Sequence, residues 1–136
     1  MILYVNACAR PDSRTDRLAR ALLQKLGPYE ELRLYDEPLR PMDAHRIALR
    51  DALLSQKDYG AEMFRYARQF AAAEQIVLSA PLWDLSFPAQ LKIYLKNIFV
   101  TGIVTRYSET GLPVGLCRAK KLYYVSTSGG PYDPRF

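Results

Sequence analysis

Three short segments of the sequence combine residue types that bind phosphate groups and flat rings. The first, at 13–15, supplies two hydroxyls and a guanidinium, and the second, at 80–86, holds the only tryptophan, Trp83. The third, at 127–130, has two hydroxyl side chains followed by two adjacent glycines, which allow backbone amides to approach a ligand closely. An anion and a planar heterocycle are the ligand groups that these residues fit.

Each of these segments comes after a stretch that predicts a β-strand. The second and third follow their strands directly, and the first is separated from its strand by a short loop. Residues 2–5 and 75–79 are apolar or β-branched runs, typical of strands buried on both faces. Residues 121–126 predict a fourth strand, and the alternation of charged and apolar residues at 31–35 indicates a strand nearer the sheet edge. The intervening segments carry helical spacing, so strands and helices are expected to alternate.

The first helix is expected to begin at a cap formed by Ser13 or Thr15 and to end at Gly27. Further helices are expected around 63–71 and from Pro88 onward, the latter capped by Ser86. Residues 43–58 indicate a mobile, weakly helical excursion, and residues 102–115 a short ribbon or ordered loop. The leucines expected to form the buried stripe of the first helix are Leu18, Leu22, Leu23 and Leu26.

Strands separated by helices imply a parallel sheet with right-handed crossovers. The loops at 6–15, 80–86 and 127–132 then emerge at one edge of that sheet, where open α/β folds bind ligands. A helix N-terminus beside Arg14 suits a phosphate. Trp83 can wall a flat ring, although its own stretch alone favours a lid over the core. Phosphate plus planar heterocycle describes flavin mononucleotide, FMN.

Other chemistries find little support in the sequence. No G-x-G-x-x-G follows the first strand and no Walker lysine is present, so neither nucleotide fingerprint applies. The two cysteines, Cys8 and Cys117, are far apart and the only histidine is His45, which argues against a metal site or a Cys-His pair.

Composition bounds the class of protein. With 136 residues, of which 49% are hydrophobic, the chain is expected to form one domain with a real core. No apolar run approaches the roughly 18 residues of a membrane span, and the N-terminal residues lack the features of a signal peptide, so we expect a cytoplasmic protein with no membrane span. The net charge of +5 fits nucleic acid, a phosphorylated small molecule or merely a solvated surface.

The sequence resembles a known family, the flavodoxin-like FMN-dependent NAD(P)H:quinone and azo-compound reductases. The resemblance runs from Tyr4 to Tyr132 and is weakest between about 36 and 60. Its most specific parts are residues 80–92, the segment from Gly102 to Leu116, and the segment from Lys120 to Gly130. It implies an α/β fold with an open parallel sheet of order 2-1-3-4 and helices on both faces.

The resemblance also implies a function. FMN would receive a hydride from NADH or NADPH and pass two electrons to a quinone or azo compound, with the cofactor carrying the chemistry. The partners are expected to be a second copy of the chain and a small-molecule acceptor, without nucleic acid. Tyr94, Ile98 and Phe99 could supply part of the dimer surface, although packing on the sheet suits Ile98 better.

The family's cofactor contacts are carried over residue by residue. Tyr107 is the one side chain expected near the substrate. The FMN phosphate would be held by Ser13, Arg14 and Thr15, and the ring by backbone groups of Pro81, Leu82, Trp83, Asp84 and Leu85 together with Thr127, Ser128, Gly129 and Gly130.

Two departures from the family stand out. Asp84 replaces the usual asparagine, and a carboxylate near the ring disfavours further negative charge there. The chain also stops at Phe136, before the usual last strand and helix, so we expect either a longer biological chain or a partner that covers the strand edge at 121–126.

Two alternatives stay open at this point. An electron-transfer flavodoxin is disfavoured by the positive charge, because such proteins tend to be acidic. A non-enzymatic module that binds nucleic acid or a regulator could use a basic patch formed by Arg10, Arg14, Arg17 and Arg20.

Overall fold

The computed structural model describes residues 1–131 and 133–135. Tyr132, at the end of the third expected loop, lies outside the described residues. Of the helices that are described, none combines the length and the apolar composition needed to cross a membrane.

Four parallel strands form the central sheet. They are β1 (Ile2–Asn6), β2 (Tyr29–Arg33), β3 (Gln75–Ser79) and β6 (Leu122–Val125). The order is β2-β1-β3-β6, which confirms the expected arrangement of four strands. Every residue of β1 is buried, as the apolar run at 2–5 predicts, and so is the polar Asn6 at its end. The strands β2 and β6 form the edges and are half exposed.

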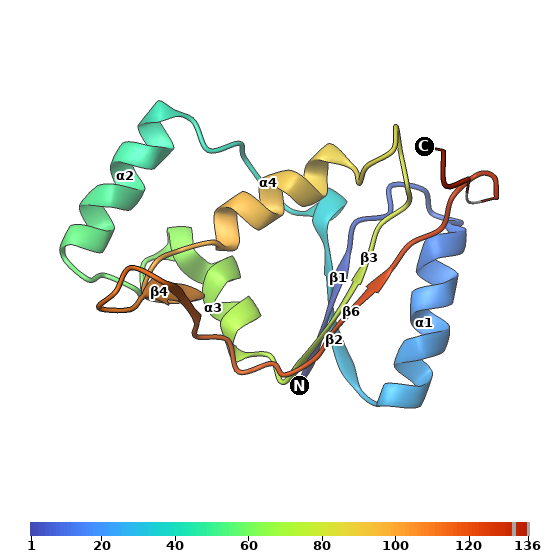
Figure 1. Ribbon diagram of the computed structural model, residues 1–136, viewed down its shortest axis with the longest axis horizontal. Helices are drawn as coiled ribbons and strands as arrows, with labels where there is room; N and C mark the ends of the chain where they lie inside the picture. Colours follow the sequence, from blue (N-terminus) through green and yellow to red (C-terminus); the bar gives the residue numbers. More distant parts are fainter. Residues whose placement is uncertain (132, 136) are drawn as a thin grey trace.

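Helices cover both faces of this sheet (Figure 1). On one face lies α1 (Arg14–Leu26), and on the other lie α3 (Arg65–Ala72) and α4 (Ala89–Ile98). Because alternate residues of a strand point to opposite faces, Tyr4 and Val77 pack against α1, whereas Val5 and Leu78 belong to the larger core beneath α3 and α4. The expected α/β layering is confirmed.

The first helix begins and ends as its sequence predicts. The Ser13 side chain caps its N-terminus, and Gly27 ends it with φ 121° while its N–H donates to the Leu23 carbonyl. The expected buried stripe was partly wrong: Leu23 is fully buried, but Leu18 is 53% exposed. Leu18 lines an open cavity beside β6, where no described element covers it.

Two further expectations needed correction. The strand expected at 31–35 starts and ends two residues earlier, and Leu34–Asp36 form a 3-10 turn (η1) that still buries Leu34. The weakly helical region at 43–58 forms a regular helix, α2 (Ala44–Ser55), whose N-terminus is capped by Asp43. Since α2 buries none of its residues fully, its amphipathic signal in the sequence is weak.

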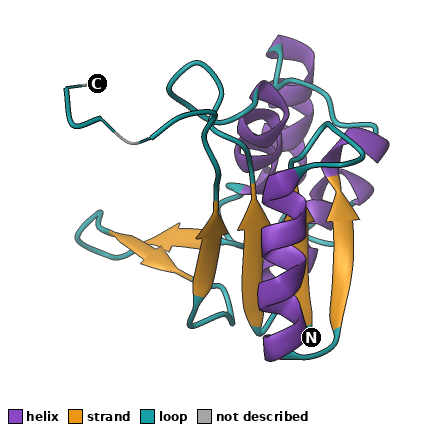
Figure 2. Ribbon diagram, turned by 90° about the vertical axis from the view of Figure 1, so that its right-hand side faces the viewer, coloured by secondary structure: helices purple, strands orange, loops and turns teal. Residues whose placement is uncertain are grey.

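The remaining elements agree with the sequence analysis. A 3-10 turn, η2 (Glu62–Phe64), precedes α3. The short ribbon consists of β4 (Thr105–Tyr107) and β5 (Pro113–Gly115), which pair in antiparallel fashion outside the main sheet. It lies on the same side of the sheet as α3 and α4 (Figure 1). Figure 2 shows the strand arrows of the central sheet pointing toward one end of the molecule, from which the ligand-site loops emerge.

Candidate functional site

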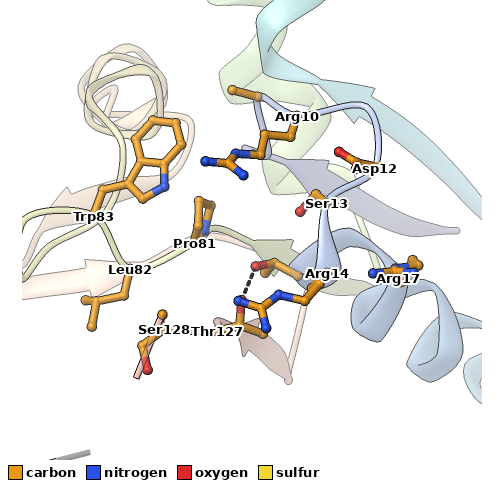
Figure 3. Close-up of a pocket in the computed structure, with 13 residues that line it drawn as sticks. Arg10, Asp12, Ser13, Arg14, Arg17, Pro81, Leu82, Trp83, Thr127 and Ser128 are labelled. Carbon is orange, nitrogen blue, oxygen red and sulfur yellow. Dashed lines mark hydrogen bonds between the residues drawn. The ribbon is translucent and has the colours of Figure 1, made fainter. Parts of the chain in front are cut away.

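A cavity of about 460 Å³ opens at the carboxyl ends of β1, β3 and β6 (Figure 3). All three loops expected to form the site contribute to it, which confirms that they meet at one edge of the sheet. Its lining residues are Ala9, Arg10, Asp12, Ser13, Arg14, Thr15 and Arg17 from the first loop and α1, Pro81, Leu82 and Trp83 from the second loop, and Thr127, Ser128 and Gly129 from the third.

Ser13 shapes the polar end of the cavity. Its Oγ accepts a hydrogen bond of 3.2 Å from the Asp16 amide, so the serine is the N-cap of α1. The hydroxyl proton of Ser13 is not used in that bond and stays available to a ligand. The N-terminus of a thirteen-residue helix and the guanidinium of Arg14 lie at the same place, which makes this end suitable for an anion.

A hydrogen bond of 2.6 Å between the hydroxyls of Thr15 and Thr127 joins the first loop to the third. Either threonine can donate, but a pair of hydroxyls spends only one of its two protons on the bond between them. The other proton remains to be donated, and both residues line the cavity. The pair therefore fixes the distance between two loops and still offers one donor to a ligand.

A buried polar network lies beneath the anion-binding end. The Tyr4 hydroxyl donates to Asp16 Oδ1 at 2.6 Å and, having no second proton, accepts from Ser79 Oγ at 2.8 Å. Asn6 Oδ1 accepts from the Cys8 amide at 2.9 Å, which holds the start of the first loop. Burial, and then the neighbouring Asp16, raise the pKa of Tyr4 well above its ordinary value, so the phenol stays neutral.

Arg20 completes this network on its outer side. Its guanidinium pairs with Asp16 at 3.0 Å and with Glu31 at 2.7 Å, linking α1 to β2. Asn6 Nδ2 also donates to Glu31, at 3.1 Å. These contacts fix the first turn of α1 against two strands, and with it the position of Ser13.

The aromatic loop is built as a tight hairpin. Trp83 and Ser86 exchange two backbone hydrogen bonds of 2.8 and 2.9 Å around a two-residue turn, in which Asp84 and Leu85 have φ values of 52° and 63°. Leu82 N–H donates to the Thr127 carbonyl at 2.9 Å, which ties this loop to the third one. The hairpin carries the Trp83 indole out from the sheet to the wall of the cavity (Figure 3).

Two local expectations for this loop were wrong. Trp83 is 40% exposed on the cavity wall, and is therefore not a lid over the core. Ser86 does not cap α4, because its backbone is engaged in the hairpin and the N-cap position is Pro88, which makes no side-chain cap.

Not every expected site residue reaches the cavity. Asp84 and Leu85 occupy the hairpin turn, and Leu85 is 75% exposed, while Gly130 also lies outside the lining. Tyr107 is exposed on β4 and is not part of this cavity either. Within one chain, the structure therefore gathers the other expected cofactor contacts but leaves these four residues apart.

Part of the lining is not predicted by the sequence. Ala9 and Asp12 carry no such prediction, and Arg10 and Arg17 are predicted only as part of a basic patch. Their position in the loop between the first strand and first helix was the available signal, because the whole of that loop borders the sheet edge. Arg10 extends from this loop toward Trp83, whereas Arg17 lies on the far side of Ser13 (Figure 3).

Comparisons with known proteins agree with this architecture. The family model described as flavodoxin-like fold matches residues 1–136. The chain is 38% identical to FMN-dependent NADH:quinone oxidoreductase 2 of Clostridium acetobutylicum, covering 97% of this chain and 69% of the relative. It is 44% identical to FMN-dependent NADH:quinone oxidoreductase of Caldicellulosiruptor saccharolyticus, covering 96% and 69%.

The fold is similar to that of a solved azoreductase. An azoreductase from Bacillus anthracis str. Sterne superposes with a TM-score of 0.83 at 28% identity, covering 98% of this chain and 72% of that one. The chain therefore belongs to the flavodoxin-like family that includes the FMN-dependent NADH:quinone oxidoreductases.

Proposed function

We propose that this protein is an FMN-dependent oxidoreductase that transfers a hydride from NADH to a quinone or azo compound. The similar proteins carry the names FMN-dependent NADH:quinone oxidoreductase and azoreductase. The structural observation that carries the proposal is the meeting of three loops at one cavity, with an anion-binding end and an aromatic wall.

The residues present fit this cofactor. The phosphate would be held by the N-terminus of α1, the Ser13 hydroxyl, the Arg14 guanidinium and the proton left free in the Thr15–Thr127 pair. The ring would lie against Pro81, Leu82 and Trp83, with Ser128 and Gly129 at its polar edge.

FMN, when bound, supplies the chemistry, because it accepts a hydride from NADH and returns two electrons to the acceptor. The chain binds and orients the reactants. The hydrogen-bonded pair of Thr15 and Thr127 and the bond between Leu82 and Thr127 hold the three loops at fixed spacing, which is the kind of positioning that oriented reactants require.

We also propose that the protein acts as a homodimer in the cytoplasm. Tyr94 and Ile98 cannot belong to the dimer surface, because both are buried in the core of their own chain. Phe99 is 57% exposed and stays a candidate for it. Tyr107 is exposed on β4, so it would contact the substrate only across such an interface. Light scattering gives the mass in solution, and cell fractionation gives the location.

The test is a titration of the purified protein with FMN, followed by anaerobic addition of NADH and then of menadione. We expect bound flavin, loss of its visible absorbance with NADH and recovery with the quinone. A protein that binds FMN but is not bleached by NADH would be an electron-transfer module. A protein that binds no FMN would be a binding module of another kind.

A further inference from the structure

Asp16 stands at a position from which its carboxylate could close the N-terminus of α1. Ser13 and Asp16 have the spacing of a capping box, in which the side chain of the third helical residue accepts from the backbone N–H of the cap. In the described part of the chain only half of that box is formed. Ser13 Oγ accepts from the Asp16 amide, but the Asp16 carboxylate is turned inward and does not accept from the Ser13 amide.

This arrangement leaves the amides at the start of α1 open. Among residues 1–131 and 133–135, the backbone N–H groups of Ser13, Arg14 and Thr15 donate to no protein acceptor. All three residues line the cavity. Three consecutive free donors at the positive end of a helix suit a phosphate, and a carboxylate folded back on them would compete for the same donors.

Three side chains hold the Asp16 carboxylate inward. Its Oδ1 accepts from the Tyr4 hydroxyl at 2.6 Å and from Asn6 Nδ2 at 3.3 Å, while its Oδ2 accepts from Arg20 Nε at 3.0 Å. Of the three donors, only the guanidinium is charged. It also pairs with Glu31 at 2.7 Å, so Arg20 is itself fixed against β2.

The charge of Asp16 matters to an anion because little water screens it. Its side chain is only 14% exposed, and within the described residues Arg20 is the cation that pairs with it. Without that guanidinium, an uncompensated carboxylate would lie in the first turn of the helix that faces the phosphate and would be freer to turn toward the Ser13 amide. Repulsion and competition for the amides would both weaken the binding of a phosphate.

We propose that Arg20 is a positioning residue for the phosphate of FMN, because it holds the Asp16 carboxylate off the N-terminus of α1. This inference rests on the proposed function. Arg20 does not line the cavity, so it would touch neither cofactor nor substrate. Its contribution passes through Asp16 and should therefore disappear when the carboxylate is removed.

The experiment is a double-mutant cycle measured with two flavins. Dissociation constants for FMN and for riboflavin, which lacks the phosphate, are determined by fluorescence titration for the wild type, Arg20→Gln, Asp16→Asn and the double variant. In Arg20→Gln we expect the dissociation constant of FMN to rise about tenfold and that of riboflavin to change by less than about twofold. This is the scale of one poorly screened charge acting on a doubly charged phosphate.

Removing the carboxylate as well should reverse the loss. In the double variant, the ratio of the two dissociation constants should return to within about threefold of the wild-type ratio, because the two residues act on the phosphate as one unit. Asp16→Asn alone should not weaken FMN binding relative to riboflavin binding.

Arg65→Gln is the matched control. Arg65, on α3, also pairs with two carboxylates, Glu37 and Glu62, and lies outside the cavity. Its side chain is 43% exposed, against 39% for Arg20. The ratio of the two dissociation constants should stay unchanged in this variant.

Three results would overturn the proposal. A double variant that discriminates against FMN as strongly as Arg20→Gln does would make Arg20 a merely structural residue, and so would a loss shared equally by FMN and riboflavin. The same selective loss in Arg65→Gln would reduce the effect to overall charge. If circular dichroism shows that Arg20→Gln does not fold, Asp16→Asn decides alone. A selective loss of FMN affinity there refutes the proposal, and an unchanged or stronger preference for FMN supports it.

These measurements use no electron donor, which separates this proposal from the proposed function. A ratio restored in the double variant supports the role of Arg20 even in a protein that NADH does not reduce, and an unrestored ratio refutes that role in an active reductase. Inorganic phosphate is a second probe. It should raise the Tm of the flavin-free wild type more than that of Arg20→Gln, and an equal rise would contradict the proposal.

Discussion

Ser13 has two roles that a single substitution tests together. Its Oγ caps α1, and its hydroxyl lines the anion-binding end of the cavity, where its proton is available to a ligand. We expect Ser13→Ala to lower the free energy of unfolding by about 1 kcal/mol through the lost cap. The same change should weaken FMN binding by about 1–3 kcal/mol, the scale for hydrogen bonds to charged groups. The binding of riboflavin, which has no phosphate, should weaken much less.

Asp43→Ala is the matched control for this prediction. Asp43 caps α2 by accepting from the Arg46 amide at 2.9 Å, and it lies outside the cavity. Its loss should lower stability similarly and leave FMN affinity unchanged. Equal losses of FMN and riboflavin affinity in Ser13→Ala would place the phosphate elsewhere.

Two buried tyrosines offer a second comparison at the level of single residues. The Tyr4 hydroxyl has two hydrogen-bond partners, whereas the Tyr94 hydroxyl has none among the described residues. Tyr4→Phe should cost about 1–2 kcal/mol, because it leaves buried partners unsatisfied, and Tyr94→Phe should be neutral or stabilising. Urea unfolding measures both, and a larger loss for Tyr94→Phe would contradict this account of the network.

Tyr4 also makes the free energy of unfolding depend on pH. Burial and Asp16 raise the pKa of Tyr4 above its ordinary value of 10.0, so the unfolded state loses its proton first as the pH rises. The contribution of the neutral Tyr4 phenol to the free energy of unfolding is fully present below about pH 10 and is lost progressively above it. Unfolding measured between about pH 9 and pH 11 should show a shallower decline in Tyr4→Phe than in the wild type.

At the level of elements, the hairpin at 83–86 stores backbone strain. Asp84 and Leu85 both have positive φ, and this conformation costs an ordinary side chain roughly 1–2 kcal/mol. Leu85→Gly should therefore stabilise the protein by about 0.5–1 kcal/mol after the entropy cost of glycine is subtracted. FMN affinity should persist, because only backbone groups of this turn are expected to contact the ring.

Leu112→Gly is the control for the hairpin. Leu112 is similarly exposed but has no positive φ, so its replacement should give no stabilisation. A loss of FMN affinity in Leu85→Gly would mean that the leucine side chain, and not the backbone alone, contributes to the site.

How much of the structure the sequence predicts depends on what each residue contacts. The strands at 2–5 and 75–79 were predictable, because residues buried on both faces must be apolar. Leu18 was misplaced because helical spacing identifies a stripe of leucines but not how far the sheet extends beneath it.

The site was predictable to a similar degree. Ser13 and Trp83 could be assigned because they sit in loops that follow strands, and parallel strands bring such loops together. Arg10 was not assigned, because its place in the loop after the first strand puts it at the sheet edge, but an exposed arginine has the same sequence signature whether it faces solvent or a cavity. The hairpin that exposes Trp83 depends on two positive φ values at non-glycine residues, which no local preference predicts.

At the scale of the whole molecule, β6 leaves an apolar edge. Leu122 and Tyr124 are each about half exposed, and a second cavity of about 450 Å³ lies between β6 and α1. It is lined by Leu18, Ala21, Leu22, Lys25, Tyr124, Val125 and Ser126. An unpaired strand edge of this kind favours association with other chains.

Charge on this edge should therefore reduce association. We expect Tyr124→Lys to lower the concentration-dependent scattering of the purified chain, while Leu112→Lys, on the turn of the ribbon, should change it less. Unchanged scattering in Tyr124→Lys would show that the chains do not associate through the edge of β6.

The three loops at the carboxyl edge of the sheet are proposed to form one FMN site. A crystal structure of the protein grown with FMN tests it most directly, because the described residues also form a second cavity of similar volume between α1 and β6. We predict the phosphate within hydrogen-bond distance of Ser13 Oγ and Arg14, and the ring against Pro81, Leu82 and Trp83. Flavin in the apolar cavity between α1 and β6, or a phosphate away from Ser13, would contradict the claim.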